Sequence, residues 1–106
     1  MNAPDSYRVI LIDTSDKPLV KVFVSWSSTY LGGDSWTINS GTELITEDED
    51  SYFFYGYSGS CYKLRKSSQG NLTTYATGIY NQVLQQDFVK EITVQEAINI
   101  LKGETN

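Results

Sequence analysis

The sequence predicts an α+β fold, in which an antiparallel β-sheet meander of five to seven strands, flat or curled, carries one or two C-terminal helices packed on one face. Three observations support this class. Short runs of β-branched and aromatic residues alternate with turn residues up to residue 77. Apolar residues then recur every four positions, and a helix-capping pattern follows at residues 93–96. A chain of 106 residues can bury one core, so we expect a single domain over residues 1–106.

The first two strands are expected at residues 7–13 and 19–26. Residues 7–13 are apolar on both faces, which is typical of a central strand. Residues 19–26 alternate, and their apolar face consists of Val20, Val22, Val24 and Trp26. The polar residues and proline at 14–18 predict a turn, so the two strands should form an antiparallel hairpin.

The middle of the chain predicts short strands separated by glycine-containing loops. Residues 27–34 predict a loop, and short strands are expected at 35–39 and 42–47. Residues 72–77 also have the composition of a strand.

The C-terminal part predicts helices. In residues 79–92 the spacing of apolar residues by four favours a helix, with a strand as the alternative. Thr93 and Glu96 form a capping box, because each side chain can satisfy a backbone N–H at the start of a helix. We therefore expect a helix over residues 94–102, closed by Gly103.

Composition argues against an enzyme. The chain has no histidine, which removes the usual general base and the commonest metal ligand. Its one cysteine, Cys61, cannot form an internal disulfide or hold a metal alone. Asp13 at a strand end is better explained as a turn or cap residue than as an acid–base group. We expect no catalytic residues, no metal and no cofactor.

Charge and hydropathy constrain the partners and the location. The net charge of −5 divides into −6 for residues 1–50 and +1 for residues 51–106. This distribution argues against nucleic-acid binding, which needs a dominant basic surface. No apolar run is long enough to cross a bilayer and no signal core is present, so we expect no membrane association and a cytoplasmic location.

The aromatic hairpin is the most informative segment. Six of the fourteen aromatic residues fall within residues 52–62. A strand at 51–57 should pair with 61–66 through a tight turn at 58–60. A glycine-containing turn can direct backbone N–H groups at an anion, and two cations follow on one strand face. The candidate residues for a small anionic or nucleotide-like ligand are Tyr55, Tyr57, Ser58, Gly59, Ser60, Lys63 and Arg65. The alternative is an ordinary hairpin turn with solvated cations.

The second candidate site is an acidic run. Its members are Glu47, Asp48, Glu49 and Asp50. Contiguous acids do not match the alternating ligand pattern of a calcium loop, so a solvated turn is favoured over a metal site. The run is also a candidate patch for a basic protein partner.

These observations predict a small non-enzymatic binding protein that acts through protein–protein contacts, as an inhibitor, adaptor or small subunit. Small acidic inhibitors of phages and mobile elements share this size and charge, an analogy that does not depend on fold. The alternative function is binding of a small anion at the 58–66 hairpin. We also expect a homodimer, because residues 7–13 and the aromatic strand at 51–57 carry large apolar groups on both faces, and one layer of helices covers only one face of a sheet. The alternative is a single chain whose sheet curls on itself or is covered by residues 27–47.

Overall fold

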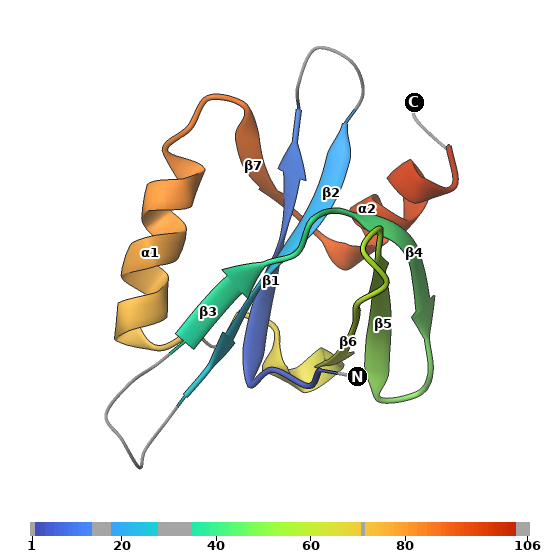
Figure 1. The fold of residues 1–106 in the computed structure, drawn as a ribbon, viewed down its shortest axis with the longest axis horizontal. Helices are drawn as coiled ribbons and strands as arrows, with labels where there is room; N and C mark the ends of the chain where they lie inside the picture. Colours follow the sequence, from blue (N-terminus) through green and yellow to red (C-terminus); the bar gives the residue numbers. More distant parts are fainter. Residues whose placement is uncertain (1, 14–17, 28–34, 71, 104–106) are drawn as a thin grey trace.

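The structure, a computed structural model, confirms the α+β class (Figure 1). It describes residues 2–13, 18–27, 35–70 and 72–103. Within these residues there are seven strands and two α-helices. The strands form two antiparallel sheets instead of one continuous meander. The turn predicted at 14–18 and the loop predicted at 27–34 lie mainly outside the described residues.

The larger sheet has four strands in the order β3-β2-β1-β7. They are β1 (Ser6–Ile12), β2 (Leu19–Trp26), β3 (Ser35–Ile38) and β7 (Val89–Ile92). Strand β1 pairs with β2 on one side and with β7 on the other. This central position confirms the prediction from its apolar residues, because both of its faces meet core side chains.

The smaller sheet has three strands in the order β4-β5-β6. They are β4 (Thr42–Glu47), β5 (Ser51–Gly56) and β6 (Cys61–Arg65). The aromatic strand β5 therefore lies between its two neighbours. At the other side of β6, the backbone of Asn2 donates to Cys61 O over 3.0 Å and accepts from Lys63 N over 2.7 Å. The N-terminal segment thus pairs with part of what is otherwise an edge strand.

The two helices begin at threonine caps. Helix α1 (Thr74–Leu84) is capped by Thr73, whose Oγ1 accepts from Ala76 N over 3.2 Å. Helix α2 (Val94–Leu101) is capped by Thr93 in the predicted capping box. Thr93 Oγ1 accepts from Glu96 N over 3.0 Å, and Glu96 Oε1 accepts from Thr93 N over 2.9 Å. A single 3-10 turn, η1 (Lys66–Ser68), follows β6.

Both faces of the four-stranded sheet are covered, by different elements. Figure 1 shows α1 on one side of this sheet, and the three-stranded sheet with α2 on the other. On the α1 side, the buried residues are Ile10, Phe23, Ala76, Tyr80 and Val89. On the other side, strands β1 and β2 pack against the inner face of the three-stranded sheet and against α2. That cluster includes Val9, Val22, Phe54, Leu64, Val94 and Ala97.

Several expectations need correction. Residues 72–77 are not a strand, because α1 starts at Thr74. Both readings of residues 79–92 are right in part: α1 continues to Leu84, and Val89–Ile92 forms strand β7. The helices do not share one face of the sheet, since α1 and α2 belong to separate core clusters. The apolar faces of β1 are consequently buried within one chain, and they no longer provide a reason for dimerisation.

Candidate functional site

The three-stranded sheet has one face that packs on the core and one that does not. Phe54, Tyr62 and Leu64 point inward and are 0, 7 and 0% exposed. Successive side chains of a strand point to opposite faces, so their neighbours along β5 and β6 point outward. The outward set, called the outer face below, consists of Leu44, Thr46, Phe53, Tyr55, Cys61, Lys63 and Arg65.

The outer face has an apolar part formed by all three strands. Tyr55 lies between Leu44 on β4 and Cys61 on β6, and Phe53 is in the next row. Leu44 is 51% exposed, whereas Phe53, Tyr55 and Cys61 are half-buried. None of these four belongs to either core cluster of the described residues. Their apolar surface therefore contributes little to the core and remains accessible at the surface.

The basic part of the outer face is on β6. Lys63 is opposite Phe53 and Arg65 is opposite Ser51, and both cations are exposed. These two residues line two hollows, of about 420 and 300 Å³. Within the described ranges, neither side chain makes an ion pair or a hydrogen bond.

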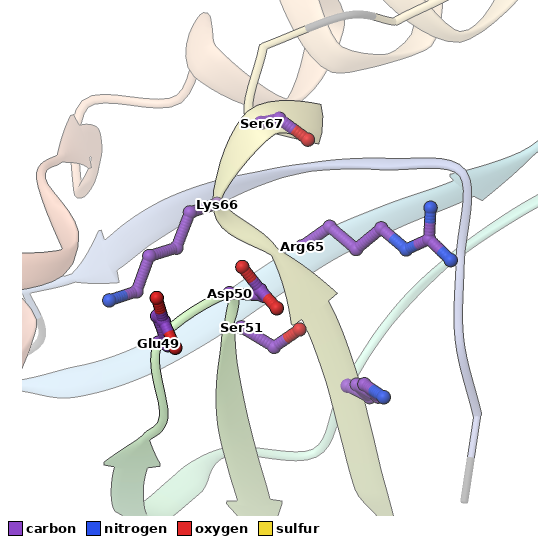
Figure 2. A pocket seen from close by; sticks show the side chains of 7 residues that line it. Glu49, Asp50, Ser51, Arg65, Lys66 and Ser67 are labelled. Carbon is purple, nitrogen blue, oxygen red and sulfur yellow. The ribbon is translucent and has the colours of Figure 1, made fainter.

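Carboxylates share both hollows with the cations. Glu49 and Asp50 line the larger hollow, and Asp5 lines the smaller one. Figure 2 shows Arg65 and Lys66 pointing away from each other, with Asp50 and Ser51 between them. Arg65 and Lys66 therefore do not converge on one point. Because Glu49 and Asp50 also line the larger hollow, its charge is mixed instead of uniformly positive.

The hairpin turn is separate from these cations. The turn at 58–60 connects β5 to β6 next to the Tyr55–Cys61 pair. Arg65 is at the other end of β6, about 13 Å from Cys61 along the strand at 3.3 Å per residue. The turn uses its own polar groups: Gly59 N donates to Gly56 O over 3.1 Å, and Gly56 N donates to Ser60 O over 2.8 Å. Gly59 has φ +89°, a conformation that favours glycine. The structure thus does not bring residues 58–60 together with Lys63 and Arg65.

Tyr57 lies near the turn and packs over Gly41. Its ring is so close that a Cβ at Gly41 would lie 2.8 Å from it. Tyr57 N also donates to Gly41 O over 3.0 Å. Tyr57 remains 52% exposed, and its ring lies near Leu19 of β2, which would be 2.9 Å from the same Cβ.

The acidic run forms the turn between β4 and β5, as predicted. Asp48 Oδ1 accepts from Asp50 N over 2.9 Å and from Ser51 N over 2.8 Å, and these bonds lower the pKa of Asp48. Glu47 pairs with Lys66 Nζ at 2.7 Å, and this hydrogen bond raises the pKa of Lys66. The Lys66 ammonium also lies 5.0 Å from the centre of the Tyr52 ring. Asp48 therefore holds the turn and Glu47 ties the end of β4 to η1, which leaves Glu49 and Asp50 at the larger hollow.

No group of three or more potential metal ligands occurs among the described residues. Cys61 is a free, half-buried cysteine on the outer face. Asp13 N donates to Phe88 O over 2.8 Å, which ties the end of β1 to the segment before β7. This is a backbone bond, and it does not involve the Asp13 carboxylate.

Sequence reasoning missed two residues of the outer face. Leu44 and Phe53 supply apolar surface next to Tyr55, but neither was among the candidates. The signal that could have found them is the alternation of residues 42–47 and 51–57, which places them on the same face as Tyr55 once the strands are paired.

Comparisons with family models, curated proteins and solved structures find no match for this chain. No helix in the part of the chain that the structure describes is long and apolar enough to span a membrane.

Proposed function

We propose that this protein is a small non-enzymatic binding module that docks on a protein partner through the outer face of β4, β5 and β6. One observation carries the proposal: Leu44, Phe53 and Tyr55 form an apolar surface that belongs to neither core cluster of the described residues. Burying such a surface against a partner removes apolar area from water at no cost to the fold.

The composition of the face fits a protein partner. Protein interfaces are enriched in aromatic residues and arginine, with an apolar centre and a polar rim. Here Tyr55 occupies the middle strand, and Arg65 lies at the border of the same face. Aromatic and arginine side chains also dominate the binding energy of measured interfaces, so Tyr55 and Arg65 are the expected anchors.

The charged residues at the border of the outer face would fix the orientation of a bound partner. The exposed cations Lys63 and Arg65 follow the β6 border, and the exposed acids Glu49 and Asp50 lie at the adjoining turn. A partner with an acidic side chain facing β6 and a basic one facing the turn would match both signs. Such complementarity mainly sets orientation and association rate.

A second candidate function is the binding of a small anion between Lys63 and Arg65. The observation that favours it is that these two unpaired cations line both hollows. The acids in the same linings oppose it, because like charge near the ligand weakens its binding. For this reason protein binding is the principal proposal and anion binding the alternative.

The experiment that tests the proposal compares partner capture by three tagged proteins in lysate of the source cells. The first is the unchanged chain, and the second is the double variant Leu44→Ser, Tyr55→Ser. The third, Tyr75→Ser, is a matched control, because Tyr75 is a 53% exposed aromatic on α1, the helix on the other side of the molecule. We expect the double variant to lose at least about tenfold in capture and the control to lose none. Equal capture by all three proteins would contradict the proposal.

The anion alternative has its own measurement. Thermal unfolding is followed with and without inorganic phosphate at constant ionic strength. If Lys63 and Arg65 form a site, phosphate raises the melting temperature of the unchanged chain, and the variant Lys63→Gln, Arg65→Gln loses this rise. No phosphate-dependent rise in the unchanged chain would remove the alternative.

A further inference from the structure

A third hollow lies on the α1 side of the four-stranded sheet. It lies beside α1 and is bordered by strands of the four-stranded sheet. Its volume is about 310 Å³. The residues that decide its chemistry are Ile10, Leu19, Lys21, Ile38, Val83 and Phe88. It shares no lining residue with the two hollows around Lys63 and Arg65.

The hollow exists because α1 covers the sheet unevenly. Tyr80 of α1 packs edge-on against Phe23, with ring centroids 5.2 Å apart, and so seals the middle of the sheet. Leu19 and Ile38 contact the hollow but remain only partly buried. Phe88, which follows the helix, is 45% exposed although it borders the same space. Apolar walls are thus left accessible between the helix and the β2 side of the sheet.

Lys21 gives the hollow a charge. Its position on β2 places it on the same sheet face as Phe23, directly opposite the buried Ile10 of β1. The described lining contains no acid, and within the described residues Lys21 forms no ion pair. A long lysine stem can lie along apolar walls while its ammonium reaches the opening. The lining therefore offers one cation, Lys21, and one side-chain amide, Gln86, in an otherwise apolar space.

We propose that this hollow binds a small amphiphilic anion, with its apolar body against Ile38, Val83 and Phe88 and its carboxylate at Lys21. The ligand should carry a negative group, because Lys21 is the one charged residue in the described lining and an anion would complement its charge. The ligand should be small, because the volume of the hollow lies at the lower end of the range for ligand pockets. This site is independent of the docking function proposed for the outer face.

The test uses octanoate, below its critical micelle concentration, as the probe, with acetate and with octanol, below its solubility limit, as comparison compounds. Binding is followed by shifts of backbone amide signals in the full chain. Octanoate should give saturable shifts at Leu19, Ile38 and Phe88, and octanol should bind about three- to fivefold more weakly because it lacks the charge. Acetate, which has no apolar body, should give no saturable shift.

Two variants separate charge from shape. In Lys21→Met, octanoate and octanol should bind equally well, because the apolar stem is kept and the charge is removed. Lys90→Met is the matched control: Lys90 is an exposed lysine opposite Leu11, on the other face of the same sheet, and its loss should leave the difference between the two probes unchanged. Lys21→Met is at a partly exposed position and removes no packing, so the comparison does not depend on a core change.

Four results would overturn the proposal. These are no saturable shift with octanoate, equal affinity of octanoate and octanol for the unchanged chain, and an unchanged ratio in Lys21→Met. The fourth is a change of the same amides with protein concentration in the absence of a probe, which would assign the hollow to a second copy of the chain.

Discussion

Tyr80 donates a hydrogen bond of 2.6 Å to Glu91 Oε1, and this bond joins helix α1 to strand β7. Arg8 of β1 completes the group, because its Nη1 lies 3.1 Å from both Glu91 oxygens. Its Nη2 donates to Gly70 O over 3.2 Å, and its guanidinium lies 5.6 Å from the centre of the Tyr80 ring. The Arg8–Glu91 ion pair and Tyr80 thus connect helix α1, strands β1 and β7, and the loop before α1.

Removal of the Tyr80 hydroxyl should therefore destabilise the fold. Tyr80→Phe deletes the bond to Glu91 and should lower the free energy of unfolding by about 1–2 kcal/mol. Tyr75→Phe on the same helix is the control, since Tyr75 is 53% exposed and should lose less than about 0.5 kcal/mol. Urea unfolding measures both. Equal stability of the two variants would show that the Tyr80–Glu91 bond does not hold α1 to β7.

Tyr7 should respond in the opposite way. Its side chain is fully buried, and its hydroxyl has no hydrogen-bond partner among the described residues. Tyr7→Phe removes an unsatisfied polar atom and keeps the ring, so stability should stay constant or rise by about 1 kcal/mol. A loss above about 1 kcal/mol in urea unfolding would show that the hydroxyl has a partner.

The same two tyrosines should make the fold sensitive to alkaline pH. Burial, followed by the charge of Tyr52, raises the pKa of Tyr7 to about 12 from 10.0. Burial and the bond to Glu91 raise the pKa of Tyr80. The unfolded chain ionises first, so the stability from each neutral phenol is complete below pH 10 and is lost as the pH rises toward the folded pKa.

This loss can be measured by urea unfolding at pH 9 and pH 11. The unchanged chain should lose stability at up to about 1.4 kcal/mol per pH unit for each buried phenol. Tyr7→Phe should flatten the dependence, because phenylalanine does not titrate. An identical slope in the variant would contradict the assignment to Tyr7.

Thr93 should be the more important of the two helix caps. Its hydroxyl accepts from Glu96 N, and Glu96 returns a bond to the Thr93 N–H, which lowers the pKa of Glu96. Thr93→Ala should cost about 1 kcal/mol of stability and fray the start of α2. Thr73→Ala should cost less, because the cap of α1 lacks the reciprocal carboxylate. A cost at Thr93 no greater than that at Thr73 would contradict the role of the capping box.

Of the two grounds for the homodimer prediction, the apolar faces of β1 are buried within one chain, whereas the outward side of the aromatic strand β5 stays accessible. Self-association should then depend on Tyr55, and partner binding would compete with it. Sedimentation equilibrium at micromolar concentration should show a dimer that Tyr55→Arg converts to a single chain. A mass of one chain for the unchanged protein at every concentration would end the dimer prediction.

The local elements could be predicted where one short pattern determines them. The apolar residues of β1, the alternation of β2 and the Thr93–Glu96 box are such patterns, and all three predictions are confirmed. The start of α1 was missed because β-branched threonines at 73–74 resemble a strand and no acid stands at the third helical position. The partition of seven strands between two sheets depends on long-range pairing that no local pattern contains.

The candidate site was predictable only in part, for a similar reason. Alternation separates Phe53 and Tyr55 from Tyr52 and Phe54, but it does not say which pair faces the core. That choice follows from the packing of Phe54 against the four-stranded sheet. The turn at 58–60 and Arg65 are close in the sequence, but the extended strand β6 holds them apart in space. Closeness in the sequence alone therefore did not show that they form no common site.

Site-specific photocrosslinking shows directly whether a partner docks on the outer face of β4, β5 and β6. A photoreactive phenylalanine analogue is placed at position 55 in one protein and at position 75 in another, and each is irradiated in lysate of the source cells. We expect a discrete protein adduct from position 55 and none from position 75. Adducts from position 75 alone would place the partner on the α1 side and contradict the claim.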